Sequence, residues 1–141
     1  MRDIFISSTF EDLNDQRMLI HTKVAPALNA FTIEKYAEQC NFVDLRIGVE
    51  DAGPEKTINT CLIRIKEAGP PNPFICIIGD RKGWVPEDAM LDLAIDALPA
   101  EHNDIKQVLR LSKGKGRSIT EIEIAYAVYG EGTENGVASK K

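Results

Sequence analysis

The amino-acid sequence predicts a single α/β domain with a small parallel β-sheet, and two observations predict this class. Three short apolar segments alternate with longer segments of helical periodicity, and short turns join them. The chain has 141 residues, of which 43% are hydrophobic and 28% charged, and this composition suits one globular core. We expect the domain to occupy residues 1–130, followed by a disordered tail or linker at 131–141.

The three apolar segments, residues 3–7, 41–49 and 74–79, are expected to be the strands. Residues 74–79 read Phe-Ile-Cys-Ile-Ile-Gly, and a wholly apolar run of this length is typical of a strand covered on both faces. The sequence therefore predicts that this strand lies at the centre of the sheet.

Two serine–glutamate pairs have the spacing of a helix capping box. Ser8 with Glu11 predicts a helix start near residue 10, and Ser118 with Glu121 predicts a helix over 119–129. Further helices are expected after Pro54, up to the Gly-Pro-Pro at 69–71, and over 91–98 and 105–111.

The first helix is expected to bury one apolar stripe. Its apolar residues recur at a spacing close to one helical turn, and they are Leu13, Ile20, Val24 and Leu28. Pro26 lacks a backbone N–H, so we expect it to kink or restart the helix.

Composition and charge argue against several classes of partner. Lys and Arg number 17 against 22 Asp and Glu, and the net charge of -5 disfavours nucleic acid. The three cysteines and the isolated His21 and His102 lack metal-ligand spacing, so no metal site is expected. The chain has neither an apolar run of roughly 18 residues nor a signal-peptide pattern. We therefore expect no membrane partner and a cytoplasmic location.

Polar residues follow the predicted strands where parallel sheets bind ligands. The candidate substrate-binding residues are Ser7, Ser8, Thr9, Arg46, Gly48, Asp80 and Arg81. Other roles stay open at this point: Ser8 equally suits a helix cap, and Arg46 could pair with a phosphate or with Glu50. Asp80 and Arg81 could bind a ligand or pair with each other.

Four blocks of sequence occur in the order found in one family. They are Phe5-Ile-Ser-Ser-Thr-Phe-Glu-Asp-Leu, Asp44-Leu-Arg-Ile-Gly-Val, Ile77-Ile-Gly-Asp-Arg-Lys-Gly-Trp-Val-Pro and Ser118-Ile-Thr-Glu-Ile-Glu-Ile-Ala. They resemble the TIR-like domain at the amino terminus of NACHT and other STAND-type ATPases, the telomerase-associated-protein-like family. The resemblance covers about residues 1–130 and implies a flavodoxin-like, three-layer TIR-like fold.

The same resemblance implies an effector or signalling role in an immune or stress receptor. The domain would self-associate and would be fused to, or partnered with, a STAND/NACHT ATPase. Catalytic TIR domains cleave NAD with a glutamate, and the pattern Ser118-Ile-x-x-x-Glu123 makes Glu123 the candidate catalytic residue, with NAD as substrate and no cofactor. Glu121 lies roughly 200° from Glu123 around a helix, so the two cannot line one pocket, and capping explains Glu121.

Two other functions remain open for this sequence. A TIR-like module can act purely in assembly, without chemistry. Nucleoside deoxyribosyltransferases have a similar sheet and also cleave a glycosidic bond with a glutamate, so an enzyme of that kind is the third alternative.

Overall fold

The computed structural model describes residues 1–9, 12–45, 53–69 and 73–134. The strands are β1 (Arg2–Ser8), β2 (Cys40–Val43) and β3 (Phe74–Ile77). The helices are α1 (Asn14–Leu19), the π-helical turn η1 (Ile20–Val24), α2 (Ala25–Tyr36), α3 (Pro54–Ala68), α4 (Asp88–Ala97), the 3-10 turn η2 (Ala100–His102), α5 (Asn103–Ser112) and α6 (Ile119–Ala127).

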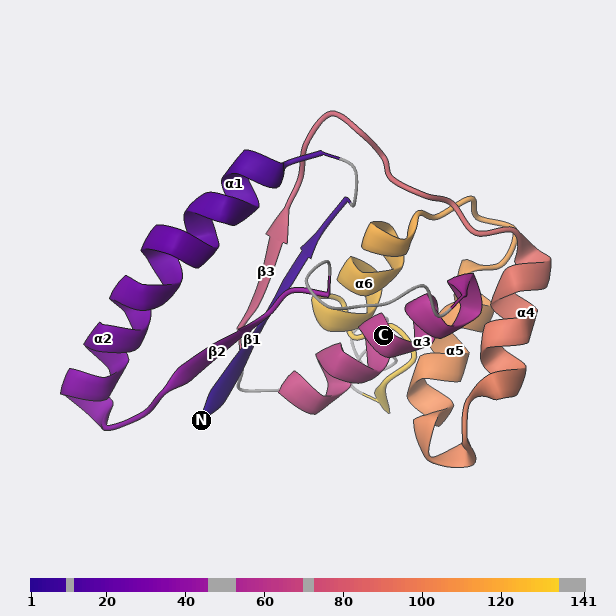
Figure 1. Cartoon of the computed structure of the whole chain (residues 1–141). Coiled ribbons are helices and arrows are strands. Elements are labelled where there is room, and N and C mark those ends of the chain that lie inside the picture. The colour runs from indigo at the N-terminus through magenta and orange to yellow at the C-terminus, as the bar shows by residue number, and fades with distance from the viewer. Residues whose placement is uncertain (10–11, 46–52, 70–72, 135–141) are drawn as a thin grey trace.

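The strands form one parallel sheet with the order β2-β1-β3 (Figure 1). Ile4 of β1 lies opposite Phe42 of β2, and Ser7 of β1 lies opposite Cys76 of β3. This mixed α/β architecture with a small parallel sheet is consistent with a flavodoxin-like fold. The chain first adds β2 on one side of β1 and then β3 on the other, so β1 and β3 form a topological switch point.

The prediction that residues 74–79 form the central strand is wrong. Among the described strands β1 holds the centre, and β3 ends at Ile77 on an edge with every residue half-buried. Ile78, just beyond it, is 77% exposed. An apolar run indicates that a strand has apolar neighbours, but it carries no information about the order of strands in the sheet.

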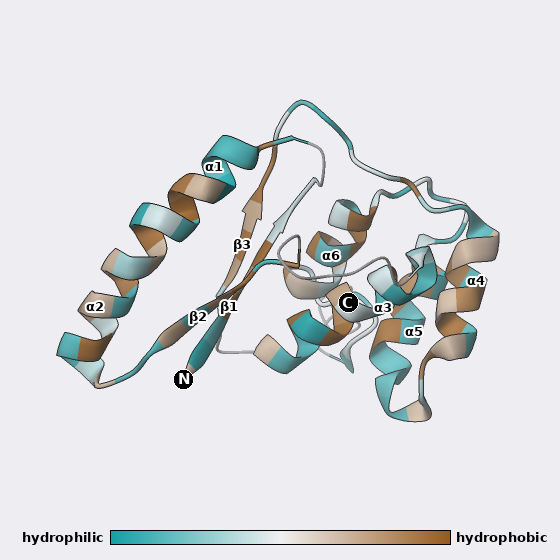
Figure 2. Cartoon of the chain, in the orientation of Figure 1, coloured by the Kyte–Doolittle hydropathy of each residue, from teal (hydrophilic) through white to brown (hydrophobic). Residues whose placement is uncertain are grey.

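The main hydrophobic core lies on the side of the sheet covered by α3 to α6 (Figures 1 and 2). Phe5 of β1 stacks on Phe74 of β3 at a ring-centroid distance of 5.9 Å. Ile58, Leu62, Leu109 and Ile122 are among the fully buried side chains of this core. In Figure 2 the hydrophobic colour of β1 fades toward its carboxyl end, where the polar residues lie.

The first helical segment differs from its prediction at both its start and its packing. Helix α1 begins after Leu13 at Asn14, because β1 continues to Ser8, whose partner in the sheet is Ile77. Ser8 is therefore a strand residue and not a helix cap, and Glu11 lies outside the described residues. The predicted apolar stripe is half-exposed, and the only residue buried over α1, η1 and α2 is Arg17.

Pro26 restarts this helix as predicted. It occupies the first turn of α2, and the π-helical turn η1 directly precedes α2. A proline ring displaces the carbonyl four residues before it, and a single π turn absorbs the resulting mismatch.

The remaining helices follow their sequence signals closely. Helix α3 starts at Pro54 and ends before Gly69, whose φ of 42° lies in the left-handed region. Helices α4 and α5 confirm the two short helices expected over 91–98 and 105–111. The capping box of α6 is present: the Ser118 hydroxyl accepts from the Glu121 amide at 3.2 Å, and the Glu121 carboxylate accepts from the Ser118 amide at 2.6 Å.

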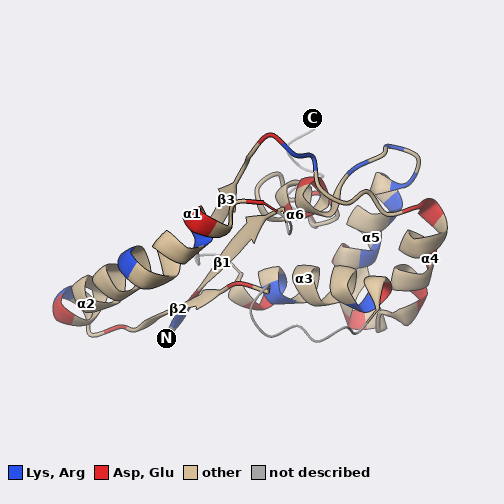
Figure 3. Ribbon diagram, turned by 45° about the horizontal axis from the view of Figure 1, so that its top comes forward, with Lys and Arg blue, Asp and Glu red and all other residues tan. Residues whose placement is uncertain are grey.

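Charged side chains of both signs are intermingled over the elements (Figure 3). The predicted boundary at residue 130 stays a prediction, although Arg117 makes a two-pronged ion pair with Glu131 at 2.6 and 3.0 Å. Over the described parts of the chain, no helix combines the length and apolar character that crossing a bilayer requires.

Candidate functional site

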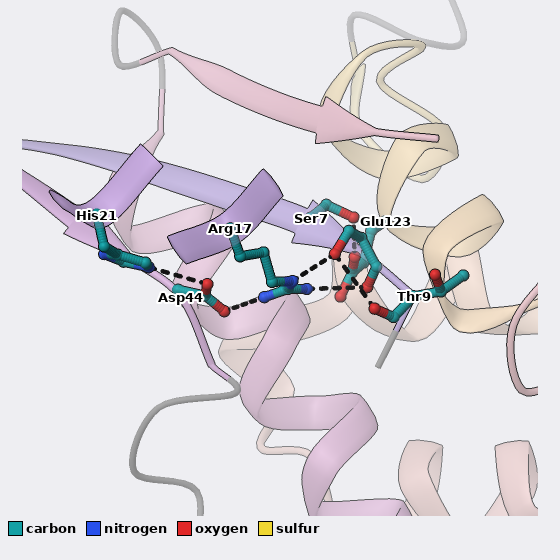
Figure 4. Close-up of polar contacts among 7 residues, drawn as sticks. Ser7, Thr9, Arg17, His21, Asp44 and Glu123 are labelled. Carbon is teal, nitrogen blue, oxygen red and sulfur yellow. Dashed lines mark hydrogen bonds and ion pairs between the residues drawn. The ribbon is translucent and has the colours of Figure 1, made fainter. Parts of the chain in front are cut away.

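A cluster of buried polar side chains lies at the carboxyl end of β1 (Figure 4). It surrounds a cavity of about 10 Å³, which has room for about one water molecule. The polar residues lining this cavity are Ser7, Ser8, Arg17, Asp44, Cys61 and Glu123, which we call the buried polar cluster. They come from β1, α1, α3, α6 and the residue after β2, so the cluster depends on the fold of the whole domain.

Glu123 lies on the face of α6 that packs against β1 and α3, and it is 4% exposed. Its carboxylate accepts hydrogen bonds from the Ser7 hydroxyl and the Cys61 thiol. Burial raises the pKa of Glu123 to about 7, and the bonds from Ser7 and Cys61 and the positive charge of Arg17 oppose this rise. At neutral pH the carboxyl group is therefore divided between its protonated and ionised forms.

Arg17 joins α1 to the ends of β1 and β2. Its guanidinium pairs with the Asp44 carboxylate, and its Nε donates to the Ser8 hydroxyl at 2.6 Å. The Ser8 carbonyl accepts a further bond from Nη2 at 3.2 Å. The second oxygen of Asp44 lies 3.0 Å from Nε2 of His21, one turn further along the helix. Three polar groups thus hold one buried cation beside Glu123, and His21 bonds to one of them.

A second and larger depression lies at the carboxyl ends of β1 and β3. Its volume is about 350 Å³, within the size range of ligand pockets. Its lining residues are Thr9, Ile77, Ile78, Gly79, Asp80, Arg81, Lys82, Ser118, Thr120, Glu121 and Ile124, and we call it the switch-point depression. Thr9 follows Ser7 by two residues, about 6.6 Å along a strand, so the depression lies next to the buried polar cluster.

The structure separates the predicted site residues into two groups. Ser7 and Ser8 belong to the buried polar cluster, whereas Thr9, Asp80 and Arg81 line the switch-point depression. The predicted Arg46 and Gly48 lie outside the described residues.

The two glutamates of α6 face different surroundings, as their spacing predicts. Glu121 is exposed and caps the helix, and it also lines the switch-point depression. Glu123 is neither a cap nor a solvated helix residue.

Sequence reasoning missed Arg17 and Asp44 as parts of the site. Arg17 stands four residues after Leu13 and three before Ile20, so a charge interrupts the apolar stripe of that helix. A basic residue on an otherwise apolar face is a signal that it needs a buried partner. Asp44, between Val43 and Leu45, is the matching interruption at the end of β2.

The arrangement offers a carboxyl group with a pKa near neutrality, a hydroxyl donor and a fixed cation at the end of a strand. Such a carboxyl group can stabilise a positive charge when ionised or donate a proton when neutral. Among the described residues, no three His, Cys, Asp or Glu side chains converge closely enough to hold a metal ion.

Comparison with known proteins identifies a family and several relatives. The family model described as "Domain of unknown function (DUF4062)" matches residues 3–134. The chain is 29% identical over 123 residues to "Telomerase protein component 1" of Rattus norvegicus, and 28% identical over 123 residues to the protein of that name from Mus musculus. Each match covers 86% of this chain and 4% of the relative, so the chain spans a small part of these relatives' length. No solved structure matches the chain significantly.

Proposed function

This chain belongs to the DUF4062 family, and we propose that it is a TIR-like effector domain that hydrolyses the N-glycosidic bond of NAD when copies assemble. The observation that carries the proposal is the buried Glu123 carboxylate, bonded to Ser7 at the end of β1 and next to a depression of ligand size. The four sequence blocks that resemble the TIR-like domain of STAND-type ATPases support the same function.

The proposed reaction needs one carboxylate and one water molecule. The bond between ribose C1′ and the nicotinamide nitrogen breaks, and its electron pair stays with nicotinamide. The ionised Glu123 stabilises the positive charge that develops on the ribose. Water then bonds to C1′ and releases a proton, giving ADP-ribose and nicotinamide. Because the pKa of Glu123 is about 7, the rate should rise as the pH increases through neutrality.

The test is nicotinamide release from NAD by protein clustered on an oligomeric carrier, measured by chromatography. We expect release by the wild type, and at least a hundredfold less by Glu123→Gln. Glu67→Gln is the matched control, since Glu67 is exposed and pairs with Arg64 on the surface of α3, and it should retain most of the activity. Equal release by wild type and Glu123→Gln would show that Glu123 is not the catalytic residue.

A purely scaffolding module is the second candidate function, and two observations favour it. The cavity beside Glu123 holds about one water molecule, so a substrate must widen it to reach the carboxylate. Large apolar side chains on α1 and α2, among them Phe31, Ile33 and Tyr36, are exposed and suit contact with another copy. Clustered wild type that assembles but releases no nicotinamide would favour this function.

An enzyme akin to nucleoside deoxyribosyltransferases is the third candidate. It would use the same glutamate but would exchange the base of a free deoxynucleoside instead of hydrolysing NAD. Incubation with a deoxynucleoside and a second free base distinguishes it, since a new nucleoside forms in that case alone.

The proposed partners follow from the same resemblance. We propose that the domain self-associates and works in the cytoplasm beside a STAND or NACHT ATPase. Size-exclusion chromatography with light scattering tests the first proposal: a monomer at every concentration would contradict self-association.

A further inference from the structure

The switch-point depression contains a buried hydroxyl group that the fold leaves unused. Thr9 is 6% exposed, and its Oγ1 has no hydrogen-bond partner among the residues that the structure describes. A buried hydroxyl without a partner costs about 1–3 kcal/mol, so such groups in native proteins call for an explanation. Figure 4 shows the Thr9 side chain on the α6 side of the strand end, away from Arg17.

The chain segment after β3 holds Thr9 in this orientation. A Cβ atom added at Gly83 would lie 3.0 Å from Cγ2 of Thr9, and the φ of 87° at Gly83 favours glycine as well. The methyl group of Thr9 therefore packs against the backbone of Gly83. The hydroxyl group of Thr9 is therefore able to form a hydrogen bond with a molecule bound in the depression.

The charges around the depression are balanced and do not form a phosphate site. Its ionisable residues are Asp80, Arg81, Lys82 and Glu121, two acidic and two basic, and Figure 3 shows acidic and basic segments adjoining after β3. Nζ of Lys82 lies 3.6 Å from Oε2 of Glu121. A phosphate placed here would meet two carboxylates, without the excess of positive charge that phosphate binding uses.

The amino terminus of α6 is also occupied by the protein itself. The Ile119 amide donates to the Trp84 carbonyl at 3.0 Å, and the Glu121 amide donates to the Ser118 hydroxyl. The carboxylate of Glu121 completes this cap. Anions bind at helix amino termini through free amides, and these two amides are already bonded.

The remaining lining suits a small molecule without phosphate that has a flat ring and several hydroxyl groups. Three isoleucines, Ile77, Ile78 and Ile124, provide apolar contact for a ring. Sugar hydroxyls can form hydrogen bonds with the hydroxyl groups of Thr9 and Thr120 and with the carboxylates of Asp80 and Glu121.

We propose that the switch-point depression binds a nucleoside, with Thr9 as its buried polar anchor, and that any phosphate group stays outside it. This proposal deepens the proposed function and rests on it for the identity of the nucleoside, the nicotinamide riboside half of NAD. Thr120 and Ile124 lie near Glu123 on α6, and Thr9 directly follows Ser8, the last residue of β1, so a sugar in the depression adjoins the buried polar cluster.

The test measures binding to the Glu123→Gln protein, in which turnover does not interfere. Titrations by calorimetry and by NMR use nicotinamide riboside, its 5′-monophosphate and inorganic phosphate. We expect the first two to bind with Kd values within about threefold of each other, with little dependence on salt, and inorganic phosphate not to bind. Tighter binding of the monophosphate by tenfold or more, or competition by inorganic phosphate, would overturn the proposal.

Variants of Thr9 test the anchor directly. Thr9→Val keeps the shape of the side chain and removes the hydroxyl. We expect the Kd to rise about tenfold, which corresponds to the loss of one hydrogen bond of about 1.4 kcal/mol. Thr9→Ser keeps the hydroxyl and should bind within about threefold of the parent protein. The matched control is Thr22→Val, because the Thr22 hydroxyl bonds to the Met18 carbonyl on an exposed helix surface. Unchanged nucleoside binding by Thr9→Val would contradict the anchor role.

Two outcomes separate this proposal from the proposed function. In the first outcome, a nucleoside binds in the depression but the clustered wild type releases no nicotinamide. This result supports the binding proposal and contradicts NAD hydrolysis. In the second outcome, the clustered wild type releases nicotinamide, but the nucleoside shifts NMR signals only of residues outside the depression. This result contradicts the binding proposal and leaves NAD hydrolysis supported.

Discussion

Helices α3 to α6 cover one face of the sheet with fully buried aliphatic side chains, whereas α1 and α2 cover the other face and, among the described residues, bury only Arg17. The first face gains its stability from apolar area removed from water. The second face is held by an ion pair and hydrogen bonds that end at the candidate site. The comparison teaches that the first face supplies most of the apolar burial, whereas the second face is joined to the sheet through charged and polar groups of the candidate site.

The largest expected effect is a cavity on the apolar face. Leu109 of α5 is fully buried in the core, so Leu109→Ala should lower the free energy of unfolding by about 4 kcal/mol. Urea denaturation followed by circular dichroism measures this loss. A loss below about 1 kcal/mol would mean that α5 contributes little to the core, and the contrast between the two faces would fail.

Breaking the ion pair on the other face should cost somewhat less. Arg17→Met leaves the Asp44 carboxylate buried beside His21 but without the guanidinium charge, and we expect a loss of about 3 kcal/mol. The double variant Arg17→Met with Asp44→Asn should recover at least about 1 kcal/mol, because no uncompensated charge remains. Strictly additive losses in this double-mutant cycle would show that the pair is not coupled.

The pH dependence of stability tests Glu123 without any substrate. Its folded pKa of about 7 lies above its ordinary value of 4.5, so its protonated form favours the fold. This contribution is complete below pH 4.5 and is lost as the pH rises through 7. We expect the free energy of unfolding to fall by about 2 to 3 kcal/mol between pH 5 and 8 on this account.

Glu123→Gln isolates that contribution from other titrating groups. The variant should lack this part of the pH dependence and should be more stable than the wild type at pH 8, because it carries no buried charge. Parallel stability profiles for the two proteins over pH 5 to 8 would contradict a raised pKa at Glu123.

The smallest expected effect is on the outer surface of α2. Phe31 is half-exposed and makes an edge contact with Tyr36 at 6.2 Å between ring centroids, so Phe31→Ala should cost less than about 1 kcal/mol. The same denaturation experiment measures it. A loss as large as that of Leu109→Ala would show that α2 buries more than its exposure suggests, and would end the contrast.

Local signals predicted much of this fold correctly. The capping box at Ser118 and Glu121 fixes the start of α6, and Pro54 and Gly69 bound α3, because each acts through a few neighbouring residues. The identical spacing of Ser8 and Glu11 failed, since pairing of β1 with β3 keeps Ser8 in the strand. Long-range pairing therefore overrode a local signal at that position.

The candidate site could be predicted only in part for the same reason. Glu123 and Ser7 were identified from motifs, yet their contact spans 116 positions and depends on how α6 packs on β1. Arg17 and Asp44 lie 27 positions apart, and a buried ion pair between them follows from the docking of α1 on the sheet. Each charge interrupts an apolar segment, which indicates burial without identifying its partner.

Because β3 pairs with β1 alone among the described strands, alternate amides of β3 point to the open edge of the sheet. The amide protons of β3 should exchange for deuterium through small local fluctuations. The amide protons of β1, which has strands on both sides, should exchange only when the sheet opens more widely. Deuterium should therefore mark Phe74–Ile77 well before Arg2–Ser8. The strand that forms one wall of the switch-point depression would then be the first part of the sheet to loosen, which gives an incoming molecule room at the edge of the sheet.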